Sequence, residues 1–137
     1  MSYEAHCPFC NPYKDHNQQI VFENTTCYFL QYDEQQDVLE GSGVIVPKQH
    51  RAVTFDLTKE EWNDTYDLLQ KAKEYIDATY SPDGFTLGWN VGEASNQSIH
   101  HSHFHVIPRY NDEPLAGKGL RHWLKQPENR RTKKSGN

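Results

Sequence analysis

The sequence predicts an antiparallel α+β domain, and three observations lead to that fold class. Short segments rich in β-branched and aromatic residues lie both before and after the middle of the chain, as is typical of β-strands. Between them, apolar residues recur every three or four positions from residue 62 to residue 80, which indicates one long amphipathic helix. The strand-like segments are joined by short turns, so neighbouring strands are expected to pair antiparallel.

The first strand-like segment, residues 19–32, contains two apolar runs separated by Asn24-Thr25-Thr26. We therefore expect a strand or a strand pair there. Residues 41–47 read Gly-Ser-Gly-Val-Ile-Val-Pro, which is typical of a short β-branched strand that ends at a proline.

The long helix begins after Thr58, because Thr58-Lys59-Glu60-Glu61 forms a capping box for the first free amides. It ends before Pro82. Its apolar face is formed by Trp62, Tyr66, Leu69, Ala72, Ile76 and Tyr80. This face fits the core of the domain or a dimer interface, and the sequence leaves both interpretations open.

Two further strands are expected at residues 85–91 and 99–110, separated by the polar segment 92–97. Residues 120–125 fit one short helical turn. With 137 residues, the chain is expected to form a single domain, residues 1–137.

The formal net charge of −5 is unevenly distributed. Residues 118–137 carry seven of the fourteen basic residues and a single acid, Glu128, which indicates a basic C-terminal extension on an acidic domain. Residues 130–137 contain no aromatic side chain that would stack on a base. A solvated, partly disordered end is therefore favoured over a nucleic-acid-binding tail, and no specific nucleic-acid partner is expected.

The sequence shows no signal peptide and no long apolar run that would span a membrane, so a cytoplasmic location without membrane contact is expected. Cys7 and Cys10 form a C-x-x-C pair, and Cys27 lies alone in an apolar run. In a reducing compartment such a pair indicates metal binding or thiol redox chemistry rather than a structural disulfide. Cys27 is expected to be a small buried residue.

The most informative feature is a set of three alternating histidines, His101, His103 and His105. In an extended strand alternate side chains share one face, so the imidazoles would form a row with steps of roughly 7 Å. Such a row suits metal binding, a structural or pH-sensing cluster, or a nucleophile with phosphate-binding and proton-donating neighbours. A purely structural role is disfavoured, because imidazoles are seldom stacked without function.

The segment from His101 to Ile107 resembles the signature of the histidine triad (HIT) superfamily. Further motifs that match this family are Val46-Pro47-Lys48-Gln49-His50, Cys7-Pro8-Phe9-Cys10, Asn90, Gln97-Ser98 and Pro108-Arg109. The resemblance covers about residues 7–110. It implies a HIT-like fold, a five-stranded antiparallel sheet with one long and one short helix, and a homodimer.

The resemblance also implies a covalent mechanism. His103 attacks the α-phosphorus of a nucleotide and forms a nucleotidyl-histidine intermediate, which water or another acceptor resolves. His105 contacts the phosphate and assists proton transfer. Ser98 contributes a catalytic hydrogen bond, and Asn90 and Gln97 bind the substrate. Without the family match, ordinary turn and strand-end chemistry would explain Ser98 and Asn90.

For His101 the resemblance implies a different role. Cys7, Cys10, His50 and His101 correspond to the ligand set of zinc-containing family members. Two thiolates neutralise Zn²⁺ and four protein ligands close its coordination shell, which marks a structural zinc ion rather than one that activates water. The alternative is a reduced, metal-free thiol pair.

Several residues depart from the family pattern. Ser42 stands where many members have a histidine, Asn96 replaces a glycine, and Ser102 replaces an apolar residue. His100 adds a histidine outside the alternating set, and Gln31-Tyr32 differs from the aromatic-His-Asp run that contacts the ribose in the family. The nucleoside preference is therefore left open.

Taken with these residues, the resemblance implies a histidine triad nucleotide hydrolase or nucleotidyltransferase that acts at the α-phosphate of dinucleoside polyphosphates such as diadenosine tetraphosphate. The alternatives are a nucleoside phosphoramidase of the same family, a zinc- and nucleotide-binding module without catalysis, and a metal-dependent hydrolase in which His103 and His105 hold a catalytic ion. The last is disfavoured, because few carboxylates lie near the histidines in the sequence. From its charge and its place in the family, the basic segment Lys118–Lys125, with Trp123, is expected to reach the active site and to favour polyphosphate substrates.

Overall fold

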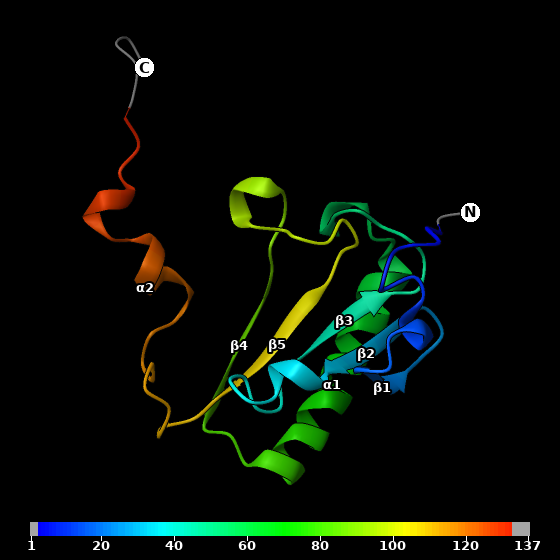
Figure 1. Cartoon of the computed structure of the whole chain (residues 1–137), viewed down its shortest axis with the longest axis horizontal. Coiled ribbons are helices and arrows are strands. Elements are labelled where there is room, and N and C mark those ends of the chain that lie inside the picture. Colours follow the sequence, from blue (N-terminus) through cyan, green and yellow to red (C-terminus); the bar gives the residue numbers. More distant parts are fainter. Residues whose placement is uncertain (1–2, 133–137) are drawn as a thin grey trace.

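The structure is a computed structural model that describes residues 3–132. Its five strands form one antiparallel sheet in the order β1-β2-β3-β5-β4 (Figure 1). The strands are β1 (Gln18–Glu23), β2 (Cys27–Tyr32), β3 (Gly43–Pro47), β4 (Gly84–Trp89) and β5 (Phe104–Arg109), and the α-helices are α1 (Lys59–Tyr80) and α2 (Leu120–Leu124). The expected α+β class is confirmed, with its five antiparallel strands, one long helix and one short helix. The segment 19–32 is a strand pair, and every other predicted strand except 99–110 agrees with the observed bounds within two residues.

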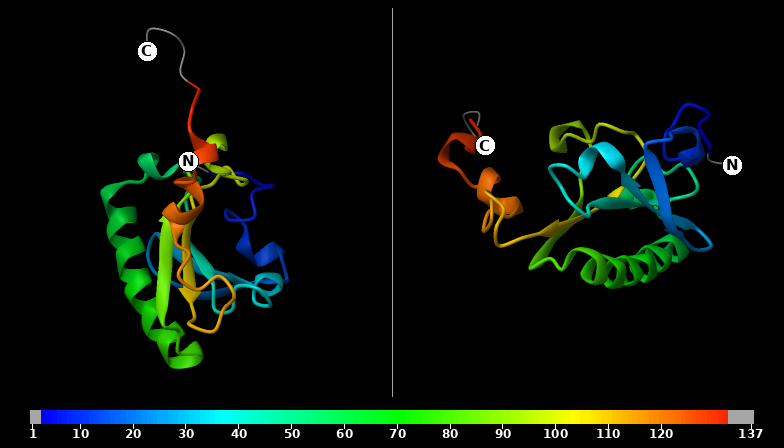
Figure 2. Two further views of the ribbon diagram at one scale, coloured as in Figure 1. Left: turned by 90° about the vertical axis from the view of Figure 1, so that its left-hand side faces the viewer. Right: turned by 60° about the horizontal axis from the view of Figure 1, so that its bottom comes forward.

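The core lies between α1 and the sheet. Figure 2 shows α1 along one face of the sheet and the N-terminal segment on the other. The buried side chains between helix and sheet are Cys27, Phe29, Ile45, Leu68, Ala72, Ile76, Phe104 and Val106. Because side chains alternate along a strand, the strand residues between these positions point away from α1.

The start of α1 confirms the predicted capping box. The Glu61 amide donates to Thr58 Oγ1 over 3.1 Å, and the Thr58 amide donates to the Glu61 carboxylate over 2.8 Å. This carboxylate is almost fully buried and also accepts a hydrogen bond from Arg51 Nε over 3.0 Å. Glu61 therefore joins the helix to the segment that follows β3.

The apolar face of α1 differs from the prediction in its first turns. Ala72 and Ile76 are buried as expected, but Trp62 and Tyr66 are 45% and 61% exposed. The buried residue of the first turn is Glu61, because its carboxylate caps the helix. A helix advances by about 100° per residue, so the inward position of Glu61 carries Trp62 toward solvent. Of the predicted apolar face, the later turns with Ala72 and Ile76 therefore pack in the core of the domain, whereas Trp62 and Tyr66 in the first turns do not.

The predicted strand 99–110 is wrong in its first half, because β5 begins only at Phe104. Phe104 is the first position of β5 that pairs with both β3 and β4. Before it, the Ser102 amide donates to the Arg51 carbonyl over 2.6 Å instead of continuing a strand ladder. The three histidines therefore do not form one row along a strand, and only His105 lies on β5.

Arg109, at the end of β5, holds the chain that follows the sheet. Its guanidinium donates to the Glu113 carboxylate and to the carbonyls of Leu115 and Lys118, each over 2.9 Å. These bonds fold the segment back before α2 begins, and α2 lies on the β4 side of the sheet (Figure 1).

The solvated tail expected over residues 130–137 falls largely outside the described part of the chain, which ends at residue 132. Within residues 3–132, none of the helices is both long and apolar enough to cross a membrane.

The turn between β1 and β2 is tied to α1 by Asp64. Thr26 donates to the Asp64 carboxylate from its amide over 3.1 Å and from its hydroxyl over 2.7 Å. The side-chain amide of Asn24 donates to the Asp64 carbonyl over 2.9 Å. These bonds fix the long helix against the first hairpin.

Replacing Asp64 by alanine is expected to lower the free energy of unfolding by about 1–3 kcal/mol, because the amide and the hydroxyl of Thr26 lose their acceptor. Urea unfolding followed by circular dichroism measures this change. Asp67→Ala, at an exposed position on the same helix, is the matched control and should change stability by less than about 0.5 kcal/mol. Equal losses in the two variants would contradict the role assigned to Asp64.

Candidate active site and metal centre

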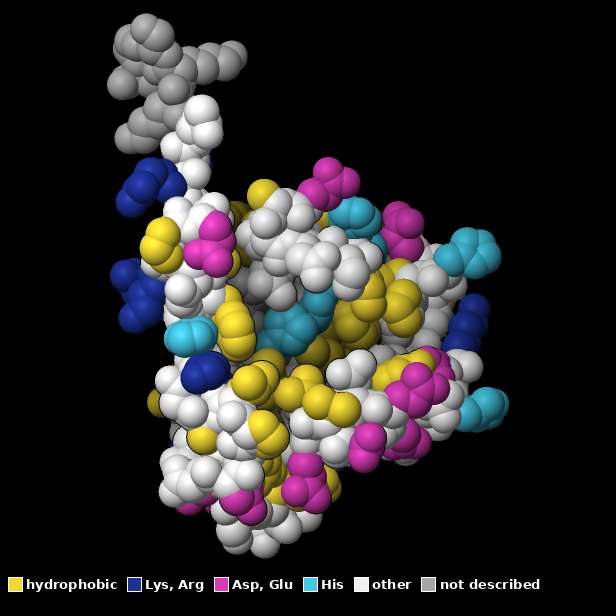
Figure 3. All heavy atoms as spheres, turned by 60° about the vertical axis from the view of Figure 1, so that its left-hand side comes forward, with side chains coloured by type: hydrophobic (Ala, Val, Ile, Leu, Met, Phe, Trp, Pro, Cys, Tyr) yellow, Lys and Arg dark blue, Asp and Glu magenta, His cyan; other side chains and the backbone are white. Residues whose placement is uncertain are grey.

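The face of the sheet away from α1 forms the floor of a cavity of about 600 Å³. Leu30, Val44 and His105 lie side by side on β2, β3 and β5 and line it. Figure 3 shows histidine side chains inside this hollow, with hydrophobic side chains around them. An apolar cavity of this size with a few polar groups is typical of a site for a small organic ligand.

His103 lies just before β5 and lines the cavity. Its Nδ1 donates to the His101 carbonyl over 2.8 Å, because a carbonyl oxygen can only accept. The lone pair of the neutral ring therefore lies on Nε2. An imidazole in this state can act as a nucleophile or a general base.

His105 is the second histidine of the cavity wall. Its ring centroid is 4.9 Å from that of His103, and the side-chain nitrogen of Asn90 lies 3.5 Å from its Nε2. Ser98, from the loop between β4 and β5, lines the same cavity. The structure thus brings together four of the residues singled out in the sequence: His103, His105, Asn90 and Ser98.

Gln97 is the predicted substrate-binding residue that the structure does not bring to the cavity wall. Its side chain is 5% exposed. The amide nitrogen donates to the carbonyls of Ala52 and Ile99 over 2.7 and 3.0 Å, and the amide oxygen accepts from the Gly92 amide over 2.9 Å. The side chain therefore shapes the loop that carries Ser98, and its polar atoms are already paired.

Burial lowers the pKa of both cavity histidines, because the loss of water disfavours the charged imidazolium. The neighbouring His103 lowers the pKa of His105 further. Both rings are therefore expected to be neutral at pH 7, which keeps the Nε2 lone pair of His103 available.

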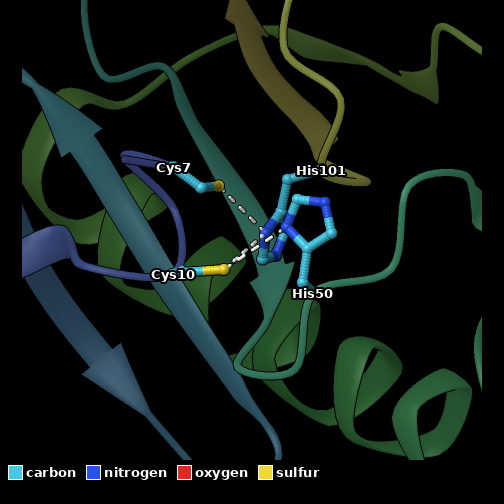
Figure 4. Close-up of side chains that lie close together, drawn as sticks. All are labelled: Cys7, Cys10, His50 and His101. Carbon is cyan, nitrogen blue, oxygen red and sulfur yellow. Dashed lines mark hydrogen bonds between the residues drawn. The ribbon is translucent and has the colours of Figure 1, made fainter. Parts of the chain in front are cut away.

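A second cluster lies next to the cavity and is formed by Cys7, Cys10, His50 and His101 (Figure 4). Its four donor atoms all lie within 4.8 Å of one another. The sulfurs of Cys7 and Cys10 lie 3.3 and 3.5 Å from His101 Nδ1, and that of Cys10 lies 3.3 Å from His50 Nδ1. Tetrahedral zinc, with bonds of about 2.3 Å to sulfur and about 2.0 Å to nitrogen, places such atoms roughly 3.6 Å apart. The donor set and its spacing therefore fit a four-coordinate metal site.

The orientation of His101 supports this assignment. The ring is fully buried, and its Nε2 donates to the Pro47 carbonyl over 2.7 Å, which leaves the Nδ1 lone pair directed at the two sulfurs. Burial lowers the pKa of His101 to about 4 and raises that of the Cys10 thiol to about 11. The imidazole is thus neutral, as ligation requires, whereas the Cys10 thiol needs a nearby cation to ionise at neutral pH.

Four departures from the family pattern can be placed in the structure. Asn96 adopts the left-handed conformation with φ 64°, which glycine favours and asparagine tolerates. The buried Ser102 hydroxyl lies 3.3 Å from the Thr54 hydroxyl, so its polar group is paired. Ser42 lines the cavity, whereas His100 is exposed and does not line it.

Sequence reasoning missed several residues of the cavity wall, among them Phe9, Asp15 and Trp89. The C-x-x-C spacing points to the sulfurs and not to Phe9 between them. Leu120 belongs to the segment 118–125 that was expected to reach the active site, and it lines the cavity because Arg109 folds the chain back before α2.

The chain is similar to proteins of one family. Residues 14–112 match the model of the HIT domain. An adenosine 5′-monophosphoramidase (hnt1) of Schizosaccharomyces pombe is 30% identical over 89 residues, which cover 65% of this chain and 64% of that protein. A bis(5′-adenosyl)-triphosphatase of Dictyostelium discoideum is 33% identical over 72 residues, which cover 53% of this chain and 48% of that protein.

The fold is also found in solved structures. A crystal structure of a HIT family protein from Bacillus anthracis superposes with a TM-score of 0.70 at 30% identity, covering 79% of this chain and 76% of that one. The matches to the two enzymes named above each span less than two thirds of the length of those proteins.

The cavity histidines are expected to titrate below the ordinary imidazole value of 6.5, because burial disfavours the imidazolium form of His103 and His105. Histidine ring signals in NMR spectra recorded over a pH series measure both midpoints. The urea-unfolded chain is the control, and its histidine midpoints should lie at about 6.5.

The sign of the effect on stability follows from these pKa values. Below about pH 6.5 the unfolded chain binds more protons at these histidines than the folded protein does. The free energy of unfolding therefore decreases as the pH falls from about 6.5 through the lower midpoints of the folded protein. Midpoints at or above 6.5 for His103 and His105 in the folded protein would contradict the assigned effect of burial.

Proposed function

Because the chain belongs to the HIT domain family, we propose that it is a nucleotide hydrolase or nucleotidyltransferase that acts through a covalent intermediate on His103. The observation that carries this proposal is the Nε2 lone pair of His103. The hydrogen bond from Nδ1 to the His101 carbonyl leaves it free at a cavity of about 600 Å³. A neutral imidazole is a good nucleophile toward phosphorus, and it leaves phosphorus readily when its ring is positively charged.

The reaction has two steps. First, His103 Nε2 forms a bond to the α-phosphorus, and the bond from this phosphorus to the leaving group breaks, so that the leaving group departs with the electron pair. The ring keeps its Nδ1 proton on the His101 carbonyl and therefore carries a positive charge. Then a water oxygen attacks the phosphorus, the phosphorus–nitrogen bond breaks with its electrons returning to Nε2, and the water releases one proton.

The neighbours of His103 suit the charges that develop in these steps. His105 and Ser98 line the cavity beside it, and Asn90 lies 3.5 Å from His105 Nε2. Their polar groups are available to bind phosphate oxygens and to pass a proton to the leaving group. Hydrogen bonds in a partly dry cavity stabilise such charge more strongly than in water.

We propose dinucleoside polyphosphates as the substrate class, and α2 is the feature that supports them. Leu120 of this helix lines the cavity, and Lys118, Arg121 and Lys125 stand in the same short segment. Positive charge beside the cavity would stabilise the phosphates that lie beyond the reacting one. The similarity to a bis(5′-adenosyl)-triphosphatase agrees with this choice, whereas the similarity to a monophosphoramidase favours nucleoside phosphoramidates as the alternative.

We further propose that Cys7, Cys10, His50 and His101 hold a structural zinc ion. Four protein ligands leave no position for water, so zinc there would supply stability rather than a nucleophile. Ligation would join the N-terminal segment to the segment that carries His103.

Intact-mass spectrometry tests the covalent intermediate after brief incubation with diadenosine tetraphosphate or adenosine 5′-phosphoramidate. Wild-type protein should carry an acid-labile nucleotidyl adduct. His103→Ala should carry none and should lose at least about 10³-fold in kcat/KM. The matched control His100→Ala, at an exposed histidine outside the cavity, should form the adduct normally. Undiminished turnover of His103→Ala would overturn the proposal, and the substrate that forms the adduct faster identifies the class.

Metal analysis tests the zinc site. Protein purified without chelators should contain one zinc ion per chain, and Cys7→Ser should contain none and melt at a lower temperature, because a metal bound only to the folded state stabilises it. Cys27→Ala should keep the ion, since Cys27 lies in the core on the α1 side of the sheet. A Cys7→Ser variant that retains zinc would contradict the assigned ligand set.

A further inference from the structure

Phe9, between the two cysteines of the C-x-x-C pair, contacts the proposed nucleophile. Its side chain is 6% exposed, and its ring centroid lies 5.2 Å from that of His103, with the ring planes tilted by 50°. The same ring meets His101 edge-on, at 5.7 Å and 79°. One aromatic side chain therefore touches both the metal cluster and the cavity histidine.

We propose that Phe9 is a positioning residue that holds the His103 imidazole in the orientation needed for attack on phosphorus. This inference rests on the proposed function, because it concerns the step that forms the nucleotidyl-histidine. Phe9 takes no part in the bond changes and acts only through its packing against the ring of His103.

His103 needs a second restraint besides its hydrogen bond. The bond from Nδ1 to the His101 carbonyl fixes one atom of the ring, but the terminal torsion of a histidine side chain has a broad energy profile. His105, the other ring neighbour at 4.9 Å, is only partly buried and is a proposed phosphate contact. Phe9 also lines the cavity, but its side chain is 6% exposed, so its packed ring is the neighbour suited to restrict rotation of His103.

The backbone around Phe9 is fixed by contacts of the residues before and after it in the chain. The side-chain amide of the buried Gln18 donates to the Pro8 carbonyl over 3.1 Å. The sulfurs of the two flanking cysteines lie 3.3 and 3.5 Å from His101 Nδ1. Ligation of a metal by these cysteines would lock the same stretch of backbone. The cluster would then influence the chemistry through Phe9 and not through a metal-bound water.

Three variants test the proposal. Phe9→Leu removes the flat ring, Phe9→Tyr keeps it, and Tyr13→Leu removes an exposed ring nearby that does not line the cavity. At saturating diadenosine tetraphosphate, the single-turnover rate of adduct formation should fall about 10- to 100-fold in Phe9→Leu, because misplacing reacting atoms by about 1 Å costs up to roughly 100-fold. Phe9→Tyr and Tyr13→Leu should stay within about threefold of wild type, and KM should not rise in any of them.

The separation of KM from kcat decides between positioning and simple substrate contact. If Phe9 only contacts the substrate, Phe9→Leu raises KM and leaves the rate at saturation unchanged, and the proposal is overturned. It is also overturned if Phe9→Tyr is as slow as Phe9→Leu. Zinc content and melting temperature are measured for every variant. Should Phe9→Leu lose the metal or unfold, Phe9→Met, which keeps much of the volume without a planar ring, is held to the same criteria.

An NMR measurement separates this inference from the proposed function. Long-range ¹H–¹⁵N spectra of His103 should show one tautomer, protonated at Nδ1, in wild type and in Phe9→Tyr. In Phe9→Leu the ring signals should broaden or report a mixture, because the ring is free to turn. An unchanged spectrum overturns the role of Phe9. If wild type forms no adduct but the spectra differ as expected, the proposed function fails and the restraint on His103 stands.

Discussion

The buried side chain of His101 is the constraint on which both parts of the site depend. Its Nε2 donates to the carbonyl of Pro47, and its Nδ1 faces the two cysteine sulfurs. Its own carbonyl accepts the Nδ1–H of His103. A fully buried imidazole is stable only when both nitrogens have partners. His101 therefore serves both parts of the site: its ring faces the cysteines on either side of Phe9, and its backbone carbonyl sets the tautomer of His103.

The sheet separates the residues that stabilise the fold from those that form the site. Phe29 and Ile45 point toward α1 and belong to the core. Leu30, Val44 and His105 point to the opposite face and line the cavity. Because strand side chains alternate, a site on one face coexists with a close-packed core on the other. The geometry of α1 likewise decides which residues face the core. Glu61 is buried in the first turn, so its neighbour Trp62 is exposed and not buried as expected.

Local signals in the sequence predicted most of the architecture, and the errors lie where distant segments meet. The capping box at Thr58 depends on residues within one helical turn, so the sequence predicted it correctly. A continuous strand through the histidines was wrong, because the Ser102 amide pairs with the Arg51 carbonyl. The side chain of Gln97 forms bonds that shape its own loop, one of them to Ala52, and its expected substrate contact stays a prediction. Neither partner is recognisable from the neighbouring residues.

The sequence by itself determined the types of the elements, the candidate ligands and the candidate nucleophile, because periodicity, caps and motif spacing are local properties of a chain. Only the tertiary structure decided how the three histidines differ. Pro47 and His101 are 54 residues apart in the sequence, and Cys7 and His101 are 94 apart. Which nitrogen of an imidazole carries the proton depends on which acceptor lies within hydrogen-bonding distance, and folding alone brings these groups together.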